Sequence, residues 1–209
     1  MVTIAKPHSS AVTATDTLRT GPPRMASEPA QASTNDQPTL AALATDSRAA
    51  NAARYVLASI RIALGFIFLW AFLDKTFGLG FATTSAKSWL NGGNPTQGFL
   101  SSSKGPFSGF FHAIAGTGLA NVLFMGGLLA IGVALILGIG MRLAASGGAL
   151  LMVMMWAAVL PPSSNPFMDD HLIYAAVLIV LALLAAGNTL GLGRAWAAVP
   201  LVERTAWLK

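Results

Sequence analysis

The sequence contains no cysteine, and charged residues make up only 10% of its 209 positions. The lack of cysteine excludes disulfides, cysteine-ligated iron–sulfur clusters, c-type haem attachment and thiol chemistry within this chain. The charged fraction is far below the roughly 25% typical of soluble domains. Because 54% of the residues are hydrophobic and gather in runs, the composition predicts an integral membrane protein that contacts the lipid bilayer.

The first part of the chain, residues 1–50, lacks an apolar run and is rich in Ala, Ser, Thr and Pro. This composition predicts a disordered tail. The tail also lacks the apolar stretch of roughly 7 to 15 residues that a secretory signal requires, so the first span is expected to direct insertion. Residues 51–209 are predicted to form one membrane domain.

Four apolar runs, each close to the ~20 residues that cross a bilayer as a helix, occupy residues 55–73, 119–139, 143–160 and 172–190. They predict an all-α membrane protein, an antiparallel four-helix transmembrane bundle. In the second run, small residues recur at every fourth position and predict a close helix contact there. These residues are Gly126, Ala130, Ala134 and Gly138. The connection to the third run is short, so the third run is expected to return beside the second, with Gly148 available for close contact.

A long connection, residues 74–118, separates the first two runs and predicts a structured outer loop. In it, Phe107, Phe110, Phe111 and Ile114 follow the helical i, i+3, i+4, i+7 spacing. They predict a short amphipathic helix that lies either in the membrane interface or over the end of the bundle.

The net positive charge gathers at the ends of the runs that face the two termini, whereas the opposite ends are balanced. By the positive-inside rule, both termini are expected in the cytoplasm, and the membrane is expected to be crossed several times. The basic composition is thus a topology signal and does not predict a nucleic-acid partner.

Two cations lie on the first run, and Arg61, Gly65, Phe68, Phe72 and Lys75 share one line along it. Charges at membrane depth usually face other helices or a wet cavity, so this line is expected to face protein. Arg61 has two interpretations. Its side chain either snorkels to the nearer interface or makes a structural pair, or it takes part directly in function.

Polar residues whose side chains could act in catalysis or binding gather at the outer end, which is the end of the runs opposite the two termini. Carboxylates and histidines can relay protons, lysine can hold an anion, and aromatic walls can hold a planar ring. The candidate catalytic residues are Asp74, Asp169, Asp170 and His171. The candidates for binding a substrate or quinone are Arg61, Lys75, Trp70, Trp89, His112 and Trp156.

Helix capping alone could account for the acidic residues before the fourth run. Asn165 and Pro166 suit a helix N-cap and first helical position, and Asp169 and Asp170 then complement the positive end of that helix. No metal or haem site is predicted, because the histidines lie on separate elements and no pair has the i, i+4 spacing of a helical metal site.

Several segments resemble the DoxX/DoxD family of small bacterial membrane proteins: RIALGFIFLWAFLDKTFG, SWLNGGNPTQGFL, LILGIGMRLAA and NPFMDDHLIYA. The similarity extends over about residues 54–207. It implies a bacterial plasma-membrane location and the activity of the better characterised branch. That branch is the large membrane subunit of thiosulfate:quinone oxidoreductase, which oxidises thiosulfate to tetrathionate and passes electrons to ubiquinone or menaquinone.

The leading hypothesis is therefore a membrane subunit of a quinone-linked oxidoreductase. Without cysteine or a metal site the chain has no electron carrier of its own, so a partner redox subunit is expected. The alternative is a non-catalytic membrane anchor or assembly protein for redox enzymes. A third hypothesis is a small-solute carrier or channel, which four spans without an internal repeat would support only as a homo-oligomer.

Overall fold

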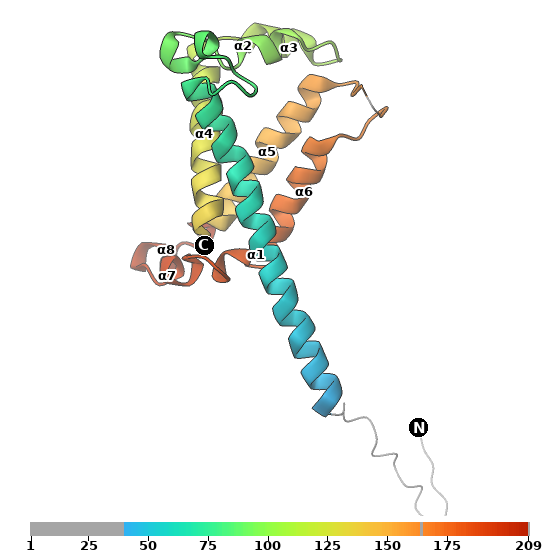
Figure 1. The fold of residues 1–209 in the computed structure, drawn as a ribbon, viewed down its shortest axis with the longest axis vertical. Helices are drawn as coiled ribbons and strands as arrows, with labels where there is room; N and C mark the ends of the chain where they lie inside the picture. Colours follow the sequence, from blue (N-terminus) through green and yellow to red (C-terminus); the bar gives the residue numbers. More distant parts are fainter. Residues whose placement is uncertain (1–39, 164, 209) are drawn as a thin grey trace, which may run out of the picture. The chain divides into compact units, whose positions relative to one another are not determined.

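A computed structural model describes the backbone of residues 40–163 and 165–208, and within these ranges the chain forms helices, turns and loops without a strand (Figure 1). The longer helices are α1 (Leu40–Phe77), α4 (Gly118–Leu137), α5 (Met141–Val159) and α6 (Asp170–Leu183). The short helices are α2 (Gln97–Ser101), α3 (Ser108–Ile114), α7 (Gly193–Ala197) and α8 (Pro200–Arg204). Single 3₁₀ turns occupy Ser85–Lys87, Trp89–Asn91, Ala186–Asn188 and Ala206–Leu208.

Three of these helices have the length and apolar composition of membrane spans: Asp46–Phe77 within α1, α4 and α5. Large apolar side chains such as Phe66, Val122 and Val153 are exposed on these helices, as lipid contact requires. The prediction of an all-helical membrane protein is confirmed at this level. α1 also includes residues 40–50, which were predicted to belong to the tail, and the rest of that predicted tail lies outside the described residues.

The fourth predicted run, residues 172–190, is helical for only part of its length. α6 ends at Leu183, about 21 Å from its start at 1.5 Å per residue, which is shorter than the ~30 Å bilayer core. Ala185 takes a left-handed conformation, with φ of 48°, and turns the chain out of the helix. The following residues, which include Gly187, Asn188 and Thr189, contact α1 and α4.

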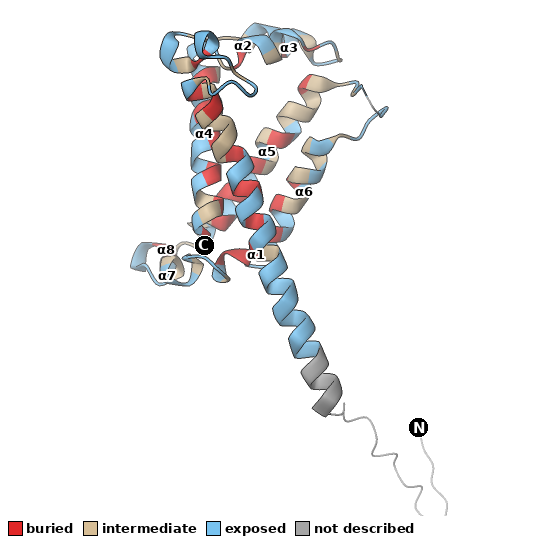
Figure 2. Cartoon of the chain, in the orientation of Figure 1, coloured by how far each residue is buried: buried red, intermediate tan, exposed pale blue. Residues whose placement is uncertain are grey.

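The helices pack in two pairs. α1 packs mainly against α4 and α5 mainly against α6, while α4 and α5 connect the pairs. The α1–α4 contact is close because it has glycine on both sides. A Cβ added to Gly132 would lie 2.7 Å from the Leu69 backbone nitrogen, and one added to Gly65 would lie 2.9 Å from the Leu135 Cβ. The buried core runs through both pairs (Figure 2).

Of the small residues predicted for close helix contact on α4, Gly138 makes a close contact, since a Cβ there would lie 2.8 Å from the Gly187 carbonyl oxygen, whereas Gly126 and Ala130 do not. Gly126 has no neighbour within 4 Å of an added Cβ, and Ala130 is exposed. Gly148 makes its closest contact with α6 and not with α4, because a Cβ there would lie 2.8 Å from Leu178 of α6 and 3.4 Å from Ile131 of α4. The close approach of α4 to α1 instead depends on Gly132.

The two ends of the helices differ. At one end, termed the Lys75 end, α2 and α3 lie across the helices; at the other, termed the Arg54 end, lie α7, α8 and the chain after α6 (Figure 1). The predicted amphipathic helix is α3, in which Phe111 is buried while Phe110 and the preceding Phe107 are exposed. α3 therefore packs over the helices through one side and leaves phenylalanines outside.

Candidate functional site

An elongated apolar groove of about 840 Å³ lies between α4 and α5. Its α4 wall includes Gly127, Ala130 and Ala134, and its α5 wall includes Gly147 and Leu151. Small side chains on both helices leave this space open. The volume is within the 300–1,000 Å³ range typical of ligand pockets.

The two ends of the groove are lined by different parts of the chain. Phe99, Phe111 and Phe124 line it toward the Lys75 end, and Trp196 of α7 lines it toward the Arg54 end. Among the described residues that line the groove, Lys75 is the one with a charged side chain. The groove can therefore hold a long apolar molecule with one polar or anionic group near Lys75.

A network of hydrogen bonds positions the loop over the groove. The buried side chain of Asn121 on α4 accepts hydrogen bonds from the Thr96 backbone nitrogen at 3.1 Å and from the Thr96 hydroxyl at 2.8 Å. The Thr96 hydroxyl in turn accepts one from the Gly116 nitrogen at 3.2 Å. Because Thr96 itself lines the groove, this network fixes one of its walls to α4.

Arg61 is fully buried, at 0% exposure, and its guanidinium binds backbone carbonyls. Nη1 donates to Leu135 and, at 3.0 Å, to Ile136 in the last turn of α4, where intrahelical partners are lacking. Nη2 donates to Thr189 at 3.2 Å and Leu190 at 2.8 Å, after α6. These contacts with carbonyls fit the structural interpretation of Arg61. Arg61 does not line the groove.

Asp74 is also a buried charge held by the backbone. Its side chain is 2% exposed and accepts hydrogen bonds from the Phe81 nitrogen at 3.3 Å and the Ala82 nitrogen at 3.0 Å. The carboxylate thus closes the turn that follows α1. Asp74 does not line the groove, whereas its neighbour Lys75 does.

Asp169 and His171 form a pair at the start of α6. Asp169 is the N-cap itself, in place of the predicted Asn165, and accepts from the His171 backbone nitrogen at 3.1 Å. Its second oxygen lies 2.6 Å from His171 Nδ1. Asp170 is exposed in the first turn. The capping interpretation therefore describes Asp169 well, while none of these three residues lines the groove.

The aromatic and histidine candidates occupy separate places. Trp70 contacts Phe66 and Phe81, Trp89 packs against the core, and Trp156 donates from Nε1 to the Phe167 carbonyl at 2.8 Å. His112 is exposed, with Nε2 3.0 Å from the Ser103 carbonyl oxygen. Within the described residues, no three His, Asp or Glu side chains gather into a group that could hold a metal ion.

Of the ten predicted site residues, Lys75 lines the groove and the other nine do not. Sequence reasoning did not find the groove. The small residues of α4 were the sequence feature that could have indicated the groove. They were interpreted as a helix contact, since small side chains can either admit a second helix or leave a space.

Comparisons of the chain with models of protein families, with curated proteins and with solved structures give no match.

Proposed function

We propose that the chain is a DoxX/DoxD-like membrane subunit of a quinone-linked oxidoreductase and that the α4–α5 groove holds the quinone. The observation that carries this proposal is the long apolar groove with Lys75 as its charged lining residue. A quinone has the matching chemistry, with an apolar isoprenoid tail and a ring that carries two oxygens. The proposal includes a four-crossing bundle, in which α6 and the chain after it complete the fourth crossing.

The residues of the groove fit such a molecule. Phe99, Phe111 and Phe124 offer aromatic faces near Lys75, where a planar ring would lie. The Lys75 ammonium can donate a hydrogen bond to a ring oxygen and stabilise negative charge on it. The small and apolar residues farther along the groove exclude water and accept the tail.

The proposed reaction needs a partner subunit. Joining two thiosulfate ions by a new S–S bond gives tetrathionate and releases two electrons, and a quinone supplies the acceptor chemistry by taking up these electrons with two protons. The chain contains no cysteine, so we assign the sulfur chemistry and the first electron acceptor to a partner redox subunit. In this chain, Lys75 orients the ring. Proton delivery by the Asp169–His171 pair would require a water chain, because the pair does not line the groove.

The first test is quinone binding by the purified full chain in nanodiscs, measured by quenching of tryptophan fluorescence with a short-tailed ubiquinone. We expect Lys75→Gln to weaken binding about tenfold, the loss of one charge-assisted hydrogen bond. Lys87→Gln is the matched control, since Lys87 is an exposed lysine of the same loop region that does not line the groove. Equal binding by the Lys75→Gln variant and the unchanged chain would contradict the role of Lys75.

A second pair of variants tests the groove itself. Ala130→Phe places a ring in the groove and is expected to abolish quinone binding, whereas Val133→Phe on the same helix enlarges an exposed residue outside the lining. Thiosulfate-dependent quinone reduction, assayed after membrane extract is added as a source of the partner, should follow the same order. Unchanged binding and turnover in Ala130→Phe would exclude the groove as the quinone site.

A non-catalytic anchor for redox enzymes is the second candidate, and a specific feature of α1 favours it. Residues 46–56 of α1 are all exposed, so this part of the helix extends beyond its contacts with the other helices (Figure 2). Such a segment is available to a partner helix. Partner-dependent turnover that survives Ala130→Phe but is lost on removal of residues 46–53 would favour the anchor over the quinone-binding subunit.

A further inference from the structure

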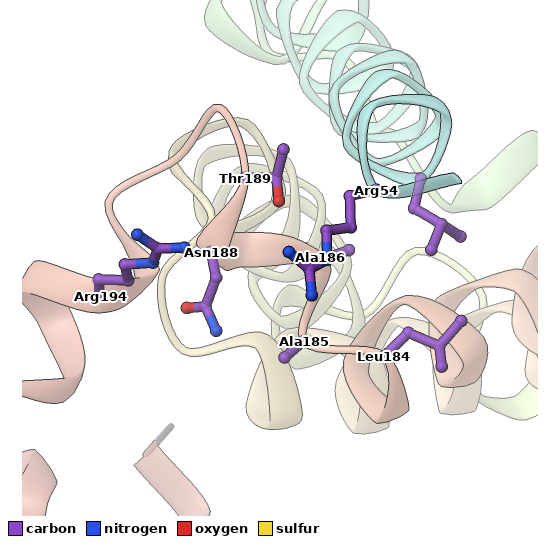
Figure 3. A pocket seen from close by; sticks show the side chains of 8 residues that line it. Arg54, Leu184, Ala185, Ala186, Asn188, Thr189 and Arg194 are labelled. Carbon is purple, nitrogen blue, oxygen red and sulfur yellow. The ribbon is translucent and has the colours of Figure 1, made fainter. Parts of the chain in front are cut away.

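A second pocket lies at the Arg54 end, between α1 and the chain that follows α6 (Figure 3). Its volume is about 240 Å³. Arg54 reaches it from α1, and Arg194 approaches the same segment from α7, beside Asn188. Two cationic side chains from separate elements thus line one small cavity.

The polar groups in this pocket suit an oxyanion. A guanidinium presents several N–H donors in a plane and binds phosphate in a bidentate manner. Asn188 and Thr189 add an amide and a hydroxyl that can donate as well. Among the described residues that line the pocket none is acidic, so the two positive charges are not neutralised within it.

The wall formed by residues 185–189 is held in place by hydrogen bonds. Arg61 binds the carbonyls of Thr189 and Leu190, and the Leu192 nitrogen donates to the Leu137 carbonyl at 2.8 Å. The Asn188 nitrogen donates to the Ala185 carbonyl at 3.0 Å. The wall is therefore tied to α1 and α4 before any ligand binds, which lowers the cost of ordering it on binding.

The position of the pocket indicates where its anion comes from. Arg54 and Lys75 lie 21 positions apart on α1, about 31 Å at 1.5 Å per residue, which is close to the ~30 Å thickness of a bilayer core. Arg54 is thus placed near a membrane boundary, the level of lipid phosphates. On the same pocket, Leu57 and Leu184 provide apolar surface for an acyl chain.

We propose that this pocket binds the phosphate of an anionic phospholipid headgroup, with Arg54 and Arg194 as its two cationic contacts. The combination of two guanidiniums with an apolar flank is typical of basic lipid-headgroup pockets beside membrane helices. This site is separate from the α4–α5 groove, and the proposal does not depend on quinone binding.

The test uses the full chain, purified and stripped of lipid in detergent, with phosphatidylglycerol as the probe and native mass spectrometry as the readout. We expect the Arg54→Gln, Arg194→Gln double variant to bind phosphatidylglycerol about tenfold more weakly. The control is Arg48→Gln with Arg204→Gln, which removes the same charge from exposed positions outside the pocket. It should weaken binding by less than about twofold, because a diffuse field is screened.

Two further arms separate the sources of the anion. Phosphatidylcholine, which carries a phosphate but no net charge, should bind more weakly than phosphatidylglycerol, and inorganic phosphate at millimolar concentration should not displace the lipid. Displacement by inorganic phosphate, or equal losses in the pocket and control variants, would overturn the assignment to a lipid headgroup at this site.

A folding defect in the glutamine variant would be detected by size-exclusion chromatography and thermal unfolding. In that case Arg54→Lys with Arg194→Lys keeps both charges and removes the bidentate geometry. We expect this variant to bind phosphatidylglycerol about threefold more weakly, because lysine offers no planar fork to the phosphate. Binding as tight as in the unchanged chain would contradict the bidentate contact that we propose.

Discussion

Arg61 shows how a guanidinium is held inside an apolar helix. Its carbonyl acceptors come from the end of α4 and from the chain after α6, two places that both have carbonyls without helical partners. Gly138 lies beside it in the left-handed conformation that ends α4, and a Cβ there would lie 2.8 Å from Arg61 Nη1. One side chain therefore joins three elements at the Arg54 end.

We expect Arg61→Gln to lower the free energy of unfolding by about 3 kcal/mol, because one buried and three part-buried carbonyls lose a charged donor. The measurement is thermal unfolding of the full chain in detergent. Arg48→Gln is the control, since Arg48 is exposed on the same helix and should cost little. A stable Arg61→Gln variant that has lost quinone binding would instead assign Arg61 a direct role in the site.

At the scale of the helix, one face of α4 packs against α1 and another face lines the groove. The face with Gly132 contacts α1 so closely that no side chain fits, whereas Gly127, Ala130 and Ala134 line the groove. Gly126 meets nothing within 4 Å of an added Cβ. The same residue type is thus a packing requirement at one position and a free position at another.

This difference gives a direct comparison of two glycines on one helix. Gly132→Ala should destabilise the protein by about 1–3 kcal/mol, because its Cβ would meet the backbone of Leu69 on α1. Gly126→Ala should be neutral or stabilising by about 0.5–1 kcal/mol, since alanine is the better helix former. Thermal unfolding of both variants checks the order, and equal effects would contradict the α1–α4 packing.

At the scale of the whole molecule, the Lys75 end and the Arg54 end carry different chemistry. The Lys75 end has α2, α3 and the charged residue of the groove, and the Arg54 end has two arginines on a smaller pocket. The orientation expected from the charge distribution places the Arg54 end in the cytoplasm.

The absence of native cysteine makes this orientation easy to test. Ala86→Cys, in the loop at the Lys75 end, and Ala198→Cys, after α7, both introduce a thiol at an exposed position. In spheroplasts, a membrane-impermeant maleimide should label Ala86→Cys directly and Ala198→Cys only after permeabilisation. The reverse pattern would invert the topology, and labelling of both from outside would contradict their separation by the membrane.

Apolar run length and helical spacing are local properties of the chain, and they predicted the membrane class, the three helices with the length of spans and the short amphipathic helix. The sequence also identified Arg61, Asp74 and Lys75 as unusual charges. The last part of the fourth run contains Gly187, Asn188 and Thr189 and is less apolar than its start. The helix ends before these residues, and the segment contacts Arg61 and Leu137.

Which charged side chains lie together depends on how the helices and loops pack. The sequence predicts that the polar residues at the Lys75 end lie at a similar depth, but their direction around each helix axis depends on packing. Asp74 turns to its own loop, Asp169 turns to His171, and Lys75 turns to the groove. Small residues on one helix can admit a second helix or leave a groove, and the position of the neighbouring helix decides between the two. No local sequence pattern specifies that position.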